Sequence, residues 1–170
     1  DHGERLGERG LVGHQLGLDE SLLRVPLVVR YPPRVTAGRT HKRVQTHGVF
    51  ATILALAGVS TPSAATLRAP ALDLQPDSIV VAQMKHQGYC LEMLKQKNPR
   101  FDPSPFSGDW SAATDGTWKL VRSSEKETRL YFLPDDPAEA HDLSAAHQDV
   151  IERMAPWLDA LPGFDAKPEE

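Results

Sequence analysis

The sequence predicts an α/β fold in which a partial sheet layer is followed by a small α+β subdomain. Three observations predict it: short apolar runs flank an amphipathic stretch in the first half, an Asp-Gly pair separates two strand-like segments in the second, and a helical apolar stripe closes the chain. We expect residues 1–85 to form the end of an α/β domain, residues 86–110 an irregular loop, and residues 111–170 an antiparallel sheet packed on a C-terminal helix.

In the first half, apolar runs and helix-end signals predict the elements. Residues 1–24 are polar and glycine-rich, which is typical of a functional loop followed by a short turn. Residues 26–31, Pro-Leu-Val-Val-Arg-Tyr, predict a buried strand. Residues 46–58 predict a helix with Thr46 as its N-cap and a glycine at its end, and residues 78–82 a second strand.

In the second half, Asp115-Gly116 predicts a two-residue hairpin that joins strands at residues 111–114 and 117–122. Residues 129–133 predict a third strand. The prolines within residues 87–109 predict an irregular segment. Its aromatic and basic residues either line a substrate mouth or form a loop packed on its own aromatic rings, and the sequence leaves both open.

The last predicted element is a helix that begins after Ser144 as its N-cap. Apolar residues recur on one of its faces at steps of three and four, and we expect them to pack on the antiparallel sheet. They are Val150, Ile151, Met154, Trp157, Leu158 and Leu161. Pro156 lies within the stripe and is expected to kink or split the helix.

Composition excludes several classes of function. The 170 residues are 40% hydrophobic and 25% charged, with no run long enough to cross a bilayer. The net charge of −4, with acidic and basic residues mixed along the chain, does not indicate the basic surface patch that binds nucleic acid. The single cysteine, Cys90, excludes an internal disulfide framework. The chain begins at Asp1 without a Met, which we interpret as truncation, and the oligomeric state stays open.

The opening Asp1-His2-Gly3 joins a carboxylate and an imidazole, both metal ligands, to a glycine that allows close backbone approach. Such a pair alone is typical of solvated surface. Ca²⁺ and Mg²⁺ prefer oxygen ligands, so first principles do not choose His2 for either ion. Glu20 and Arg24 we interpret as a structural ion pair.

Read together, four stretches stand in an order that resembles the sulfatase family of the alkaline-phosphatase superfamily. They are Asp1-His2-Gly3-Glu4 through Arg24-Val25-Pro26-Leu27; residues 44–58, ending in Leu-Ala-Gly; Gly116-Thr117-Trp118-Lys119-Leu120-Val121-Arg122; and Leu130-Tyr131-Phe132-Leu133 followed by Asp136-Pro137-Ala138-Glu139 and Asp142-Leu143. The resemblance is weakest over residues 60–110. It implies an alkaline-phosphatase-like sheet layer in the first half and the end of a sulfatase catalytic domain in residues 1–85. The strands that normally flank this layer would then be missing, so we expect an exposed apolar face on residues 27–31.

The resemblance implies one divalent cation, usually Ca²⁺, held partly by Asp1 and His2. It implies that His14 contacts the sulfate group or the leaving oxygen, where a protonated imidazole can neutralise charge or donate a proton. A hydrogen-bonded loop histidine is the alternative for His14. The family nucleophile is a formylglycine made within Cys/Ser-x-Pro-x-Arg. Cys90 lacks that Pro and Arg, so we expect the formylglycine in a missing N-terminal part.

These implications predict a metal-dependent sulfuric ester hydrolase, such as an arylsulfatase, acting on a small-molecule or glycan sulfate ester. This chain alone is then an inactive C-terminal fragment. One alternative is a phosphonate monoester or phosphodiester hydrolase of the same superfamily, and another is a non-catalytic binding module. Because sulfatases are commonly exported, a periplasmic or secreted location is expected.

Overall fold

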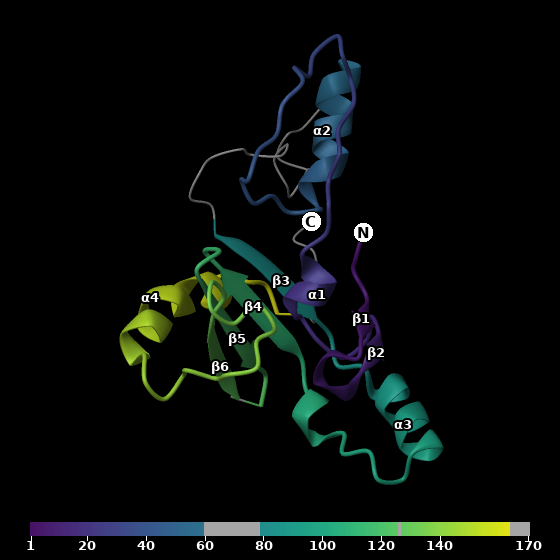
Figure 1. The fold of residues 1–170 in the computed structure, drawn as a ribbon, viewed down its shortest axis with the longest axis vertical. Coiled ribbons are helices and arrows are strands. Elements are labelled where there is room, and N and C mark those ends of the chain that lie inside the picture. Colours follow the sequence, from purple (N-terminus) through teal and green to yellow (C-terminus); the bar gives the residue numbers. More distant parts are fainter. Residues whose placement is uncertain (60–78, 126, 164–170) are drawn as a thin grey trace. The chain divides into compact units, whose positions relative to one another are not determined.

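The computed structural model describes residues 1–59, 79–125 and 127–163 (Figure 1). By its contacts the chain divides into two compact units, one of residue 1 with residues 26–80 and the other of residues 2–25 with residues 81–170. Among the described residues, no helix has the length and apolar character needed to span a membrane.

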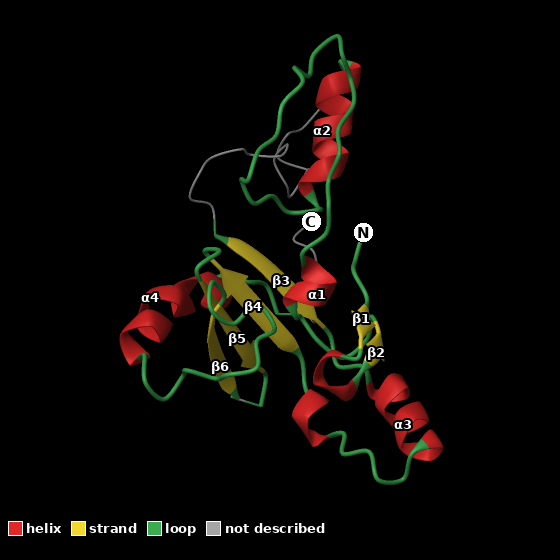
Figure 2. Cartoon of the chain, in the orientation of Figure 1, coloured by secondary structure: helices red, strands yellow, loops and turns green. Residues whose placement is uncertain are grey.

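The larger unit is built on a four-stranded antiparallel sheet in the order β3-β4-β5-β6 (Figure 2). Its strands are β3 (Val80–Met84), β4 (Trp110–Thr114), β5 (Trp118–Ser123) and β6 (Thr128–Phe132). The three strands predicted after residue 110 are confirmed. The strand predicted at residues 78–82 is β3, which lies beside β4; residue 78 is outside the described residues.

The turn between β4 and β5 is wider than the Asp-Gly pair predicts. β4 ends at Thr114 and β5 begins at Trp118, which leaves residues 115–117 between the strands. Asp115 Oδ1 accepts the amide N–H groups of Thr117 (2.8 Å) and Trp118 (2.7 Å). The prediction of a two-residue connection is therefore wrong, because the aspartate side chain binds two following amides and opens the turn.

The same bonds affect the charge of Asp115. Partial burial acts to raise the pKa of this carboxyl, but the amides of Trp118 and Thr117 and the Arg153 guanidinium outweigh burial and lower the pKa. The carboxylate form of Asp115 therefore stabilises the hairpin.

One face of the sheet packs on α4 (Gln148–Asp159), which contacts β4 and β5. Leu120, Leu130 and Met154 have no exposed surface, and Val150 and Leu158 are buried as predicted. Trp157 is 50% exposed and lies outside this interface. The N-cap is His147 and not the predicted Ser144. The predicted split at Pro156 does not occur, since α4 continues past this proline to Asp159. Pro156 lies in the last turn of the helix.

The opposite face is covered by the N-terminal segment of the same unit. Successive strand residues point to opposite faces, so Val121 and Tyr131 point away from the leucines beneath α4. They form a core cluster with Leu18, Trp110 and Ala112. The segment comprises β1 (Arg5–Leu6), the 3₁₀ turn η1 (Glu8–Gly10), β2 (Val12–Gly13) and α1 (Glu20–Leu23). The sheet is thus covered on both faces.

In the smaller unit, the prediction of a strand at residues 26–31 is wrong. These residues have no regular structure, because no described strand pairs with them. Their apolar side chains are exposed, as expected: Leu27 47%, Val28 89%, Val29 42% and Tyr31 38%. The alkaline-phosphatase-like sheet layer expected in the first half is therefore not formed by the described residues.

The predicted helix of this unit is α2 (Gly48–Ala57), and its N-cap is His47 instead of Thr46. Gly58 adopts a left-handed conformation (φ 72°) and donates its amide to Ala55 O, as a helix-ending glycine does. Phe50 and Ile53 are 60% and 58% exposed, so the apolar stripe of α2 is only partly covered.

The prediction of an irregular loop over residues 86–110 is wrong for its first half, which forms α3 (Gly88–Lys97). Those residues include the good helix formers Leu, Glu, Met, Lys and Gln, and the prolines begin only at Pro99, beyond the helix end. In the remaining loop, Phe101 stacks on Phe106 at 5.8 Å between ring centroids. This contact favours a loop packed on its own aromatic rings.

A candidate site on the N-terminal hairpin

The candidate site lies on the hairpin formed by β1 and β2. The two strands are antiparallel, with Arg5 opposite Gly13 and Leu6 opposite Val12. One step further along this register, Glu4 lies opposite His14, and Glu4 Oε1 is 2.7 Å from His14 Nδ1. The His2 ring lies 4.3 Å from the His14 ring between centroids. The hairpin thus brings together three polar side chains from two separate stretches of sequence.

His2, Glu4 and His14 form a group that is able to hold a metal ion. One ligand atom from each lies within 4.8 Å of the others, and all three residues are exposed. Within residues 1–59, 79–125 and 127–163, no other group of three His, Cys, Asp or Glu side chains converges in this way. The sequence indicated His2 and His14 but missed Glu4. In an extended segment, residues two apart point to the same side of the chain, so the position of Glu4 relative to His2 was the available signal.

Asp1, the other predicted ligand, is exposed and belongs by its contacts to the smaller unit. It is not a member of the group of three. Its role as a metal ligand therefore stays a prediction.

Gly3 fixes the segment between His2 and Glu4. Its amide donates to Leu22 O at 2.8 Å, which ties the opening of the chain to α1. A Cβ atom at this position would collide with the carbonyl oxygen of Ser21. The glycine is thus required by close backbone approach and not by an unusual backbone angle.

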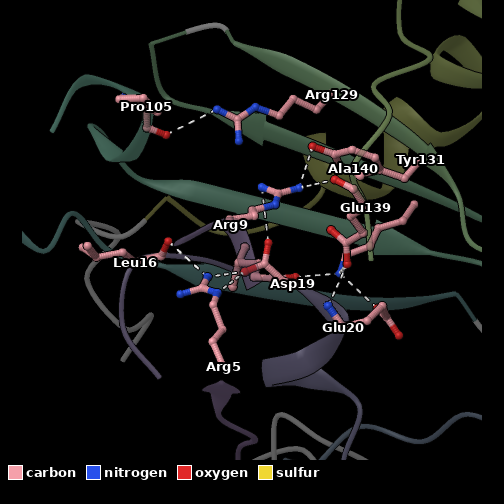
Figure 3. A network of polar contacts seen from close by, with 12 residues as sticks. Arg5, Arg9, Leu16, Asp19, Glu20, Pro105, Arg129, Tyr131, Glu139 and Ala140 are labelled. Carbon is pink, nitrogen blue, oxygen red and sulfur yellow. Dashed lines mark hydrogen bonds and ion pairs between the residues drawn. The ribbon is translucent and has the colours of Figure 1, made fainter. Parts of the chain in front are cut away.

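Arg5 links β1 to the residues that follow β2, and Figure 3 shows its guanidinium beside Leu16 and Asp19. Its side chain is 1% exposed and forms an ion pair with Asp19 through Nε at 2.6 Å and through Nη2. Its guanidinium also donates to the carbonyl oxygens of Gln15 and Leu16. Because Arg5 follows Glu4 and Gln15 follows His14, this one side chain restrains the positions of both neighbours.

A second buried cation joins the N-terminal segment to the sheet. Lys119 of β5 has no exposed side-chain surface, and its Nζ donates to Leu18 O (2.6 Å), Glu20 Oε1 (3.0 Å) and Glu139 Oε1 (2.8 Å). Burial raises the pKa of Glu139, against the opposing effect of the Lys119 ammonium. The interpretation of Glu20 as a structural ion-pair residue is confirmed, but its partner is Lys119 and not Arg24.

Arg9 extends this network across the same face of the sheet. Figure 3 shows its guanidinium between Asp19 and Tyr131. It donates to Tyr131 Oη (3.0 Å) and to the carbonyl oxygen of Glu139 (2.6 Å), and it lies 3.3 Å from Asp19. The N-terminal segment, residues 2–25, carries the candidate site. It is therefore held on the sheet by ion pairs and hydrogen bonds as well as by apolar packing.

The group of three does not fit the Ca²⁺ ion that the resemblance implies. Ca²⁺ takes six to eight oxygen ligands, whereas His2, Glu4 and His14 offer two imidazole nitrogens and one carboxylate. No catalytic step is therefore assigned to a calcium ion at this group.

No protein-family model matches the chain, and no curated protein matches it. Among solved structures, its fold is similar to that of BT4656, solved in complex with its substrate D-glucosamine-2-N,6-O-disulfate. The likeness has a TM-score of 0.62 at 19% sequence identity and covers 97% of this chain. This chain spans 35% of the length of BT4656. The likeness shows a shared fold.

Proposed function

We propose that this chain is the C-terminal part of a sulfatase, a hydrolase that cleaves sulfate esters of a small molecule or a glycan. One observation carries the proposal: nearly the whole chain shares its fold with a protein whose substrate is a sulfated sugar. The sulfatase motifs of the sequence support it independently, since they follow the order of that family from Asp1 to Leu143.

In this proposal His14 contacts the sulfate group. Glu4 accepts a hydrogen bond from His14 Nδ1 at 2.7 Å and so orients the ring. Nε2 is then the nitrogen that contacts a sulfate oxygen or donates a proton to the departing alkoxide. About half of the His14 side chain is exposed, at 47%, which leaves it accessible to a substrate.

The remaining catalytic parts are proposed to lie outside this chain. They comprise a formylglycine nucleophile and further carboxylates suited to Ca²⁺, to which Asp1 would add one oxygen ligand. Cys90 is half-buried in α3 and lacks the sequence required for conversion to formylglycine. A periplasmic or secreted location is proposed on the resemblance alone.

The test is to express the complete reading frame that contains this chain and to measure hydrolysis of aryl and sugar sulfates. Phosphonate monoesters and phosphodiesters are measured alongside. We expect sulfate esters to be preferred and His14→Ala to lower kcat by about 10²–10⁴, the usual contribution of a positioned acid–base group. The control is His41→Ala, at an exposed histidine of the smaller unit.

The 170-residue chain by itself is expected to hydrolyse no sulfate ester above background, because it lacks the nucleophile. Turnover by this chain in the presence of a chelator would refute the proposal. Preference of the complete protein for a phosphodiester would favour the related hydrolase instead, and absence of any hydrolysis would favour a binding module.

A further inference from the structure

We propose that His2, Glu4 and His14 form a binding site for a transition-metal ion of the zinc class, and not for Ca²⁺. Imidazole nitrogen suits Zn²⁺, Cu²⁺, Fe²⁺ and Ni²⁺, whereas Ca²⁺ and Mg²⁺ select oxygen ligands. A set of two histidines and one carboxylate with open coordination positions is a ligand set that proteins use for catalytic zinc. This inference concerns the chain itself and does not require the proposed hydrolase activity.

The spacing of the three side chains suits such an ion. Zn²⁺ binds nitrogen and oxygen at about 2.0–2.2 Å, so tetrahedral ligands lie about 3.4 Å apart. The ligand atoms of this group already lie within 4.8 Å of one another. Glu4 Oε1 and His14 Nδ1, at 2.7 Å, need to separate by only about 0.7 Å to admit the ion between them. Small movements of exposed side-chain ends thus complete the site.

The orientation of His2 also fits a ligand role. Its Nδ1 lies 3.0 Å from the carbonyl oxygen of Gly3. In the tautomer that donates this hydrogen bond, Nε2 carries the lone pair. Metal-binding histidines commonly donate their second nitrogen to a backbone carbonyl in this way, which fixes the ring and raises its basicity.

Hydrogen bonds hold the backbone around the site in the absence of an ion. Glu4 and His14 lie on paired strands, and Arg5 donates to the carbonyl oxygens of Gln15 and Leu16 from a buried position. Gly3 is tied to α1 through Leu22 O. Ligands held on such a scaffold lose little conformational entropy on binding, which favours affinity.

Metal binding would engage the residue that is proposed to meet the sulfate group. The ion would bind His14 through Nδ1, the atom that faces Glu4, whereas Nε2 is the atom proposed to contact the sulfate group. An ion at this site would thus replace the hydrogen bond from Nδ1 to Glu4. The metal site is therefore tested by binding alone, and its outcome is independent of the hydrolysis assay.

The experiment is isothermal titration of the tag-free, chelator-treated chain with Zn²⁺ and, separately, with Ca²⁺. We expect Zn²⁺ to bind at one site per chain, with an affinity at least about a hundredfold above that for Ca²⁺. Glu4→Gln and His14→Ala should each weaken Zn²⁺ binding by more than the roughly 10–100-fold that loss of an outer-shell partner costs. His2→Ala provides a third measure should either variant fail to fold.

Two control variants make the test specific. His41→Ala removes an exposed histidine elsewhere and should leave Zn²⁺ affinity unchanged. Asp1→Asn should also leave it unchanged, because Asp1 is not a member of the group. The proposal is overturned if Ca²⁺ binds as tightly as Zn²⁺, if His14→Ala retains full Zn²⁺ affinity, or if Asp1→Asn weakens Zn²⁺ binding as much as Glu4→Gln does.

Discussion

The Lys119→Met substitution measures how much the buried ion pairs that hold the N-terminal segment on the sheet contribute to the free energy of unfolding. The change replaces a fully buried ammonium by an apolar side chain of similar length. It removes the hydrogen bonds from Nζ to Leu18 O, Glu20 and Glu139. The side chain of Glu139 is only 2% exposed, so its carboxylate is left buried without its cation.

The expected loss in the free energy of unfolding follows from these contacts. Three hydrogen bonds to a charged group contribute about 1.5–3 kcal/mol each before the cost of burying the charge. Removing one member of a buried ion pair costs about 3–5 kcal/mol net. Glu139 limits the loss, because its pKa is already raised by burial and it can take up a proton. Protonation from an ordinary pKa of about 4.3 costs about 4 kcal/mol at pH 7. We therefore expect a loss of about 3–4 kcal/mol.

Urea unfolding followed by tryptophan fluorescence is the assay. All three tryptophans lie in the larger unit, so the signal reports on that unit. With an m-value of about 2 kcal/mol/M, a loss of 3 kcal/mol lowers the midpoint by about 1.5 M. Adding Glu139→Gln should restore part of the loss, because the unpaired carboxylate is then absent.

The matched control is Lys97→Met, the same change at an exposed lysine at the end of α3. Its free energy of unfolding should stay within about 0.5 kcal/mol of the original. A loss in the free energy of unfolding below about 1 kcal/mol for Lys119→Met would refute the view that these ion pairs hold the N-terminal segment on the sheet.

Two further predictions concern the hairpins. The lowered pKa of Asp115 stabilises the fold above its ordinary pKa of about 3.9, and this contribution disappears as the pH falls through the lowered value. Asp115→Asn should therefore cost about 1 kcal/mol at pH 7 and progressively less toward pH 2 in urea titrations, and a pH-independent difference would contradict this. Gly3→Ala should cost about 1–3 kcal/mol in the same assay, because its Cβ collides with Ser21 O. Gly163→Ala, where a Cβ meets nothing within 4 Å, should cost almost nothing and serves as the control.

The sequence alone determined the elements whose signals are local. The Asp-Gly pair between two strand-like segments located β4 and β5, and the stripe of Val150, Met154 and Leu158 located α4 and the face it buries. These predictions succeeded because strand and helix periods are read within a few neighbouring residues. His2 and His14 were selected because the opening motif resembles that of the sulfatase family, and this resemblance can be seen without a fold.

The tertiary structure decided what depends on partners far away in the sequence. Residues 26–31 carry a strand-like run but have no described strand beside them, so they stay irregular. Glu4 entered the candidate site only because β1 pairs with β2 in a register that sets it opposite His14. Lys119 looks like a solvated strand residue in the sequence. Its burial depends on the N-terminal segment crossing that face of the sheet, where a backbone carbonyl and two carboxylates stabilise the charge that burial would otherwise disfavour.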